Sequence, residues 1–165
     1  MTDHPSVARA NGILEIARAA EMRALLRYWL SVHPRDALPG RRDFDPAAVP
    51  GALANLVLTE VERDPLRFRV RLMGTAVVRA FGKDFTGRYL DEALPGVVDT
   101  VIHTDRVAVV ETGLPSYRHG ATAMPIKFDF APIERVYLPL ATDGATVDMI
   151  LAMTLYLTRS ADRRR

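Results

Sequence analysis

Residues 146–158 constrain the fold of this 165-residue chain more than any other segment. Their sequence is "TVDMILAMTLYLT", which is nearly all apolar. Because successive side chains of a strand point to opposite faces of a sheet, a strand of this composition has two faces to bury. We therefore predict a central strand here, with a covering layer on each face of its sheet.

A hairpin in residues 55–74 is predicted to supply the first two strands. Its sequence is "NLVLTEVERDPLRFRVRLMG", and its Asp-Pro pair at 64–65 indicates the turn. After the turn, Phe68, Val70 and Leu72 alternate with arginines, which is the period of a strand with one buried and one charged face. We predict that these three apolar side chains point into the protein.

The charged face of this hairpin is predicted to be a solvated ladder of ion pairs. If the turn places Glu62 opposite Arg67, then Glu60 lies opposite Arg69, and each pair joins unlike charges across the strands. This pattern favours a solvent-exposed sheet face over an arginine-lined binding site.

The first long helix is predicted over residues 12–32. Asn11 is a suitable N-cap, and Pro34 ends the segment. Spacing of three and four residues places one apolar stripe on this helix: Ile13, Ile16, Ala17, Ala20, Ala24, Tyr28 and Trp29. Residues 1–10 show no periodicity, and we expect them to be mobile.

The remaining elements complete an α+β protein. A short helix is predicted over residues 75–81 and a longer one over residues 96–112, and three strand-like segments follow. This order predicts a five-stranded antiparallel sheet with helices on one face and the N-terminal helix on the other. We expect a single domain over residues 11–158 and a basic tail over residues 159–165.

Composition narrows the classes of function. The chain has no cysteine, which excludes disulfides, thiolate metal sites and cysteine nucleophiles. No segment is long and apolar enough to span a bilayer, so we expect a cytoplasmic protein with no membrane partner. The formal net charge is only +2 and the arginines are spread along the chain, which disfavours a nucleic-acid-binding surface.

Motif spacing argues against a nucleotide cradle and against a metal site. Gly74 and the Gly-Lys pair at 82–83 suggest a phosphate loop, but seven residues separate the two glycines and Asp84 follows the lysine. The four histidines are scattered, with no pair at the spacing of a metal-binding helix. We therefore predict no metal site.

Nucleophilic catalysis has no support from the sequence, although one kind of enzyme stays open. The chain has no G-x-S-x-G segment and no suggestive grouping of serine, histidine and acid. A small α+β enzyme, however, needs only one buried carboxylate, for which Asp84, Glu134 and Asp148 are candidates. We predict no catalytic residue, with a small enzyme as the alternative.

The element order and several landmarks resemble those of PAS domains. The segment "RVRLMGTAVVRAFGKDFTGRYLDE" is similar to the second strand and following helices of that family, where a glycine ends the strand and a Gly-Arg turn opens the next helix. Trp29, "FDP" at residues 44–46 and the Glu-Arg pair at 134–135 before "LPL" resemble an alphaproteobacterial family of stand-alone PAS-like proteins. The resemblance covers residues 25–158.

The resemblance implies a strand order of 2-1-5-4-3, with the last strand central, and a sensory role. PAS domains that bind haem use a histidine of the long helix, where His103 lies, but His103 groups with Asp99 and Arg106 away from the apolar stripe. We therefore disfavour haem and expect an unidentified small molecule. A flavin–cysteine light sensor is excluded because there is no cysteine.

A buried pocket for a small molecule is the leading hypothesis for the site, and a filled core is the alternative. The predicted wall consists of Phe68, Val70, Leu72, Val77, Val78, Phe81, Tyr89, Leu90, Val98, Ile102, Tyr117, Phe128, Leu138 and Met153. The polar candidates are Arg79, Arg88 and His103, together with the hydroxyl of Tyr89. For Arg135, the neighbouring Glu134 predicts a structural ion pair rather than ligand binding.

The N-terminal helix supports a second hypothesis. PAS domains commonly dimerise through a helix on the outer sheet face, and Tyr28 and Trp29 are predicted to make that contact. The alternative is a helix packed only on its own sheet. We expect a non-catalytic module in bacterial signalling that binds a small ligand, or a signalling protein such as a histidine kinase. A small enzyme and a nucleic-acid-binding regulator are the alternatives.

Overall fold

The computed structural model describes residues 2–121, 123–124 and 130–158. At its centre is a five-stranded sheet in which all neighbouring strands are antiparallel. The strands are β1 (Leu56–Glu62), β2 (Arg67–Met73), β3 (Ser116–Gly120), β4 (Phe130–Leu140) and β5 (Met149–Thr158). Their order across the sheet is β2-β1-β5-β4-β3, which confirms the predicted order.

Helices and 3-10 turns flank this sheet. The chain begins with α1 (Pro5–Ile16), α2 (Ala20–Val32), η1 (Arg41–Asp43), η2 (Pro46–Ala48) and η3 (Pro50–Asn55). Between β2 and β3 lie α3 (Thr75–Phe81), α4 (Leu90–Ala93), η4 (Val97–Asp99) and α5 (Val101–Thr112). None of the helices described has the length and apolar character needed to cross a membrane.

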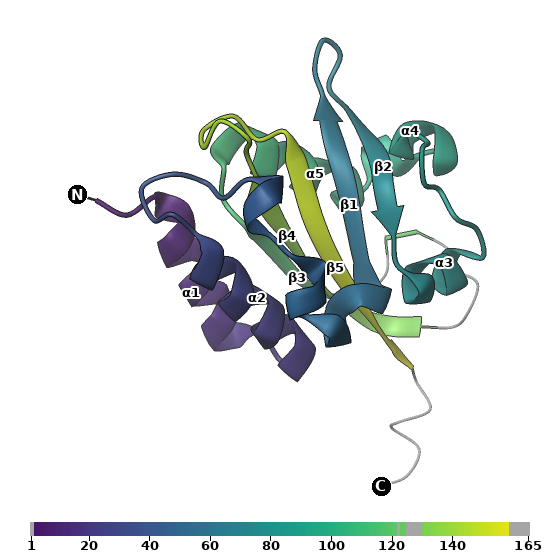
Figure 1. Cartoon of the computed structure of the whole chain (residues 1–165). Coiled ribbons are helices and arrows are strands. Elements are labelled where there is room, and N and C mark those ends of the chain that lie inside the picture. The colour runs from purple at the N-terminus through teal and green to yellow at the C-terminus, as the bar shows by residue number, and fades with distance from the viewer. Residues whose placement is uncertain (1, 122, 125–129, 159–165) are drawn as a thin grey trace, which may run out of the picture.

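The last strand is central and buried on both faces, as its composition predicts. Ile150, Leu151, Ala152 and Met153 are each at most 3% exposed. Figure 1 shows the covering layers, with α1 and α2 on one side of the sheet and α5 on the other. The predicted α+β class and the N-terminal helical cover are therefore confirmed.

The prediction that residues 1–10 are mobile is wrong for residues 5–10, which form the first half of α1. Pro5 occupies the first turn, where its missing amide hydrogen is not needed. His4 Nδ1 accepts a hydrogen bond from the Ser6 amide at 3.1 Å and so caps the helix. Val7 and Ala10 are buried, which anchors this segment to the body of the protein.

The single helix predicted over residues 12–32 is also wrong, because the chain leaves the helical conformation between α1 and α2. Ala17 and Ala19 have extended backbones. The backbone amides of Arg18 and Ala19 donate instead to the carboxylate of Glu134 in β4, at 2.7 and 3.0 Å. A buried acceptor from the sheet therefore replaces the hydrogen bonds that a continuous helix would make.

The break changes which side chains of the second helix face the sheet. Trp29, predicted at a dimer contact, is 0% exposed and packs edge-on against His33. Tyr28 packs edge-on against Phe44, and its hydroxyl accepts a hydrogen bond from the Asp45 amide at 3.0 Å. The prediction that Trp29 makes a dimer contact is therefore wrong, because its side chain is wholly buried. Tyr28 is partly exposed, so its part in such a contact stays a prediction.

The hairpin has the predicted register near its turn but not at its far end. Glu62 lies opposite Arg67 and Glu60 opposite Arg69, as expected. The register then shifts between Leu58 and Thr59, which leaves an extra residue in β2. Beyond the shift, Leu72 pairs with Leu58 and is 40% exposed. The prediction that Leu72 points inward with Phe68 and Val70 is wrong for this reason.

The charged face of the hairpin forms ion pairs, although they run diagonally. Arg69 lies 3.6 Å from Glu62, and Arg71 lies 3.2 Å from Glu60. Arg67 instead binds Asp91 in α4, donating at 2.8 and 2.7 Å. Exposed pairs of this kind contribute about 0–1 kcal/mol each, so they define a solvated face rather than a site.

Candidate functional site

A cavity of about 70 Å³ lies between the sheet and the helices that follow β2. Its apolar lining residues are Val57, Val70, Met73, Val77, Phe81, Phe85, Leu90, Leu94, Ile102, Ala123, Met124, Ile133 and Ala152. Its polar lining residues are Arg106, Arg135, Tyr137, Thr154 and Tyr156. An apolar enclosure with a few polar groups is the usual composition of a small-molecule site.

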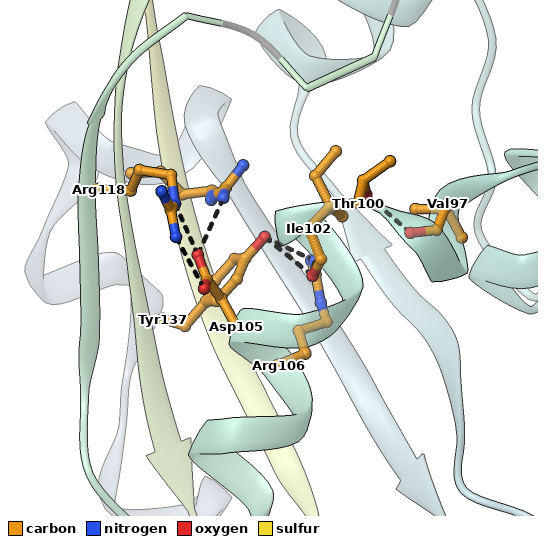
Figure 2. Close-up of polar contacts among 8 residues, drawn as sticks. Val97, Thr100, Ile102, Asp105, Arg106, Arg118 and Tyr137 are labelled. Carbon is orange, nitrogen blue, oxygen red and sulfur yellow. Dashed lines mark hydrogen bonds and ion pairs between the residues drawn. The ribbon is translucent and has the colours of Figure 1, made fainter.

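Arg106 is the most unusual residue of this lining. It is only 4% exposed, and it lies in α5 one turn after Ile102. Its Nη1 donates to the Ile102 carbonyl oxygen at 3.0 Å and to the Tyr137 hydroxyl at 2.7 Å, as Figure 2 shows. Its Nε is buried and has no hydrogen-bond partner within the described part of the chain.

The electrostatics around Arg106 are unfavourable for its charge. Burial lowers the pKa of Arg106, and the positive charge of Arg135 adds to this effect, against an opposing contribution from Tyr137. An arginine with such a shift still keeps its proton near neutral pH. Both guanidinium groups lie over the Tyr137 ring, at 4.3 Å for Arg106 and 4.9 Å for Arg135. The cavity wall therefore carries buried positive charge.

A single carboxylate, that of Asp105, accepts hydrogen bonds from the two other arginines of this region. Asp105 accepts two hydrogen bonds from Arg118, at 2.8 and 3.0 Å, and one from Arg135 at 3.4 Å. Figure 2 shows Asp105 joined to Arg118, with no hydrogen bond between Asp105 and Arg106. The predicted ion pair between Arg135 and Glu134 is wrong, because adjacent residues of β4 point to opposite faces of the sheet. Among the described residues, Asp105 thus binds two guanidinium groups, and Arg106 has no share in it.

The phenol of Tyr156 is uncharged in the neutral pH range. Burial, followed by the effect of neighbouring Tyr137, raises the pKa of Tyr156. Thr154 is buried on the same face of β5, two residues before Tyr156. The cavity therefore combines cationic, phenolic and hydroxyl groups along one wall with apolar side chains around them.

The structure brings five of the predicted wall residues into this lining: Val70, Val77, Phe81, Leu90 and Ile102. Leu72, Tyr117, Leu138 and Met153 belong to the opposite face of the sheet, so their prediction as wall residues is wrong. Val98 is 49% exposed, and Phe68, Val78 and Tyr89 do not line the cavity. Phe128 lies outside the described residues.

None of the predicted polar candidates lines the cavity. Arg79 is exposed, and Arg88 reaches the backbone oxygen of Glu92 at 3.5 Å. Tyr89 lies beneath the guanidinium groups of the hairpin. His103 packs edge-on against Phe68, with 5.6 Å between the ring centroids. The described lining therefore contains no histidine that could ligate haem iron.

Sequence reasoning missed the polar residues that do line the cavity, although a signal for one existed. Arg106 follows Ile102 by four residues, which places both on the same face of a helix. Ile102 was assigned to the pocket, whereas Arg106 was grouped with solvent-facing residues because of its charge. Tyr137 and Thr154 gave no such signal, since only the pairing of β4 with β5 places them together.

A serine–histidine contact near the N-terminus lacks the proton arrangement of a catalytic pair. Ser6 Oγ lies 2.9 Å from His33 Nε2. His33 Nδ1 accepts a hydrogen bond from the Arg35 amide, so the ring proton is on Nε2 and donates to Ser6. A general base needs a free Nε2. Burial, followed by His4 and Arg35, lowers the pKa of His33 to about 4 and keeps the ring neutral.

The three carboxylates considered for an enzyme do not lie in the cavity lining. Asp84 is exposed and accepts hydrogen bonds from the amide and hydroxyl of Thr86. Glu134 faces the N-terminal helices, and Asp148 accepts from the Thr142 amide at 3.0 Å. Within the described ranges, no group of acidic or histidine residues has the arrangement of a metal site.

Comparison with known proteins identifies the family. A family model described as "PAS domain" matches residues 17–154. Among solved structures, the chain is similar to a sensory box sensor histidine kinase from Vibrio cholerae, with 14% identity and a TM-score of 0.47, covering 64% of this chain and 84% of that one. No match was found among curated proteins.

A second solved structure comes from a study of the light-oxygen-voltage domain mechanism with a flavin analogue. It has 15% identity and a TM-score of 0.48, covering 70% of this chain and 85% of that one. The family match itself includes all five strands up to residue 154 and the whole of α2 through α5. On this match, the chain belongs to the PAS domain family.

Proposed function

We propose that this PAS domain is a non-catalytic sensory module of a signalling system, which binds a small molecule in the cavity and passes the change to a partner protein. The observation that carries the proposal is Arg106, a buried guanidinium group in the wall of the cavity. Arg106 has no carboxylate partner among the described residues, and a filled core would gain nothing from such a buried charge because burying it is costly.

The sheet offers a route from the cavity to the opposite face. In β4, Arg135 lines the cavity while the adjacent Glu134 holds the amides at the start of α2. A ligand that draws Arg135 toward it therefore acts on the strand that anchors the N-terminal helices. This coupling supports a role in which α1 and α2 transmit the binding event.

We further propose that the partner, a second copy of this chain or a protein such as a histidine kinase, contacts the exposed side of α1. Ala8, Gly12 and Ile16 lie there at four-residue spacing, and Ile16 is 61% exposed. Light scattering at high micromolar concentration tests the homodimer. We expect a dimer that Ile16→Arg converts to a monomer and that the control Val98→Arg leaves intact. A monomeric wild-type protein would rule the homodimer out.

Ligand binding is tested by native mass spectrometry of freshly purified protein and by a thermal-shift screen of small metabolites. A ligand at a hundred times its Kd should raise the Tm by about 5–10 °C. The control is Ala152→Leu, which fills the cavity from β5 and should abolish the shift. The proposal fails if no compound, charged or neutral, shifts the Tm and no small molecule is carried through purification.

A further inference from the structure

We propose that the cavity binds a short aliphatic carboxylate, whose charged group pairs with Arg106 and whose carbon chain lies among the apolar side chains. The inference rests on the proposed function, because it names the ligand class of the same site. It is carried by the charge of the cavity, by the donors in its wall and by its size.

The charge of the site calls for an anion. Arg106 is almost completely buried and has no carboxylate partner among the described residues. Asp105, the acid of this region, is already bound by Arg118 and Arg135. A buried cation without a counter-ion is strongly unfavourable, so the site gains most from a ligand that brings one negative charge.

The available donors suit a carboxylate. Arg106 uses Nη1 for the Ile102 carbonyl and the Tyr137 hydroxyl, which leaves its buried Nε without a hydrogen bond to any described residue. A guanidinium edge donates in a planar fork that matches the two oxygens of a carboxylate. Thr154 belongs to the same lining, and its hydroxyl is a further possible donor.

The remainder of the cavity suits a short carbon chain. Thirteen of the eighteen lining residues are apolar, so a doubly charged phosphate would leave most of its oxygens without donors. The cavity volume of about 70 Å³ is less than half that of the engineered apolar cavity that binds benzene. These limits favour a chain of roughly three to five carbons over an aromatic or nucleotide ligand.

The test compares sodium butyrate with butyramide, which has nearly the same shape but no charge, by isothermal titration calorimetry and thermal shift. Pairing with a buried guanidinium should make butyrate bind roughly 10- to 100-fold more tightly than butyramide. Sodium phosphate should bind more weakly than butyrate. Equal binding of acid and amide, or tighter binding of phosphate, would overturn the inference while leaving a ligand-binding module in place.

Variants at Arg106 identify the group responsible. Arg106→Met keeps the length of the side chain but removes the charge, and should abolish the preference for the acid. Arg106→Lys should keep a weakened preference. The matched control is Arg118→Met, which removes a guanidinium that does not line the cavity and should leave the preference unchanged. A preference that survives Arg106→Met and is lost in Arg118→Met would overturn the assignment.

The Tm of the ligand-free protein distinguishes the ligand-binding role of Arg106 from a purely structural one, because the two roles predict opposite effects of replacing it. A buried charge with no counter-ion among the described residues is costly, so replacing it by an apolar side chain of similar volume removes that cost. We therefore expect Arg106→Met to unfold at a Tm equal to or above that of the ligand-free wild type. If Arg106 serves only to hold α5 on the sheet, its loss should lower the Tm, and that result would count against the ligand role.

Discussion

Gly74→Ala should destabilise the protein by about 3 kcal/mol or more, because there is no space for a β-carbon at this position. A β-carbon added to Gly74 would meet backbone atoms of η3, among them the carbonyl oxygens of Leu53 and Ala54, with the first at 2.6 Å. The backbone angles of Gly74 are ordinary, so the effect comes from this close approach alone. Gly74 is also the N-cap of α3, and its amide donates to the Leu56 carbonyl oxygen at 2.7 Å.

Equilibrium unfolding in urea measures this effect, and Gly12→Ala is the matched control. No atom lies within 4 Å of a β-carbon at Gly12, which lies inside α1. Alanine should therefore stabilise that helix by about 0.5–1 kcal/mol. The two substitutions add the same methyl group and are expected to change the free energy of unfolding in opposite directions. Similar values for both would contradict the close approach of the start of α3 to η3.

Glu134→Ala should cost about 3–5 kcal/mol of folding free energy, because it removes the acceptor for three donors. The Glu134 carboxylate accepts from the amides of Arg18 and Ala19 and, at 2.6 Å, from the hydroxyl of Tyr117. It is only 1% exposed. Loss of the Glu134 carboxylate should release the start of α2. The substitution should therefore accelerate amide hydrogen exchange in α1 and α2 more than in β5.

Tyr117→Phe is the graded control for this prediction, since it removes one of the three hydrogen bonds and should cost about 1–2 kcal/mol. Burial and the hydrogen bond to Glu134 raise the pKa of Tyr117 to about 12, so the phenol is a donor throughout the neutral range. A cost for Glu134→Ala no larger than that for Tyr117→Phe would show that the backbone amides do not depend on the carboxylate.

The pH dependence of stability provides an independent check on Glu134. Burial alone would raise its pKa, but the hydrogen bonds from Arg18, Tyr117 and Ala19 outweigh burial and hold the pKa below its usual value. A carboxyl whose pKa is lower when folded stabilises the protein above its unfolded pKa, near 4.5. That contribution is lost as the pH falls through the folded value, and Glu134→Gln should lack this acid-induced loss.

Local sequence pattern was sufficient for the sheet but not for the irregular points of the chain. The alternation in β2 predicted the pairing of Glu62 with Arg67 and of Glu60 with Arg69, because period-2 burial and turn position are local properties. The bulge beyond them was not predictable, since it depends on how β1 packs on both of its neighbours. It moved Leu72 out of the cavity and left Met73 in it.

For the candidate site too, the sequence pattern was sufficient for apolar residues but not for the buried polar ones. The predicted wall residues Val70, Val77 and Ile102 line the cavity, because apolar side chains at strand and helix periods identify the buried face of each element. Arg106 was missed, because its charge indicates solvent unless the partners that bury it are known. Tyr137, its hydrogen-bond partner, is 31 residues away along the chain.

By itself, the sequence determined the α+β class, the central position of β5 and the order of the elements, since these follow from hydrophobic period and from where turns interrupt it. Only the tertiary structure decided the break between α1 and α2, the bulge in β2 and the buried charge in the cavity. Each of these depends on a contact between distant segments, such as Glu134 with Arg18 across 116 positions. The sequence pattern does not distinguish a carboxylate or guanidinium group that is exposed to solvent from one that has a buried partner. That distinction depends on the tertiary fold.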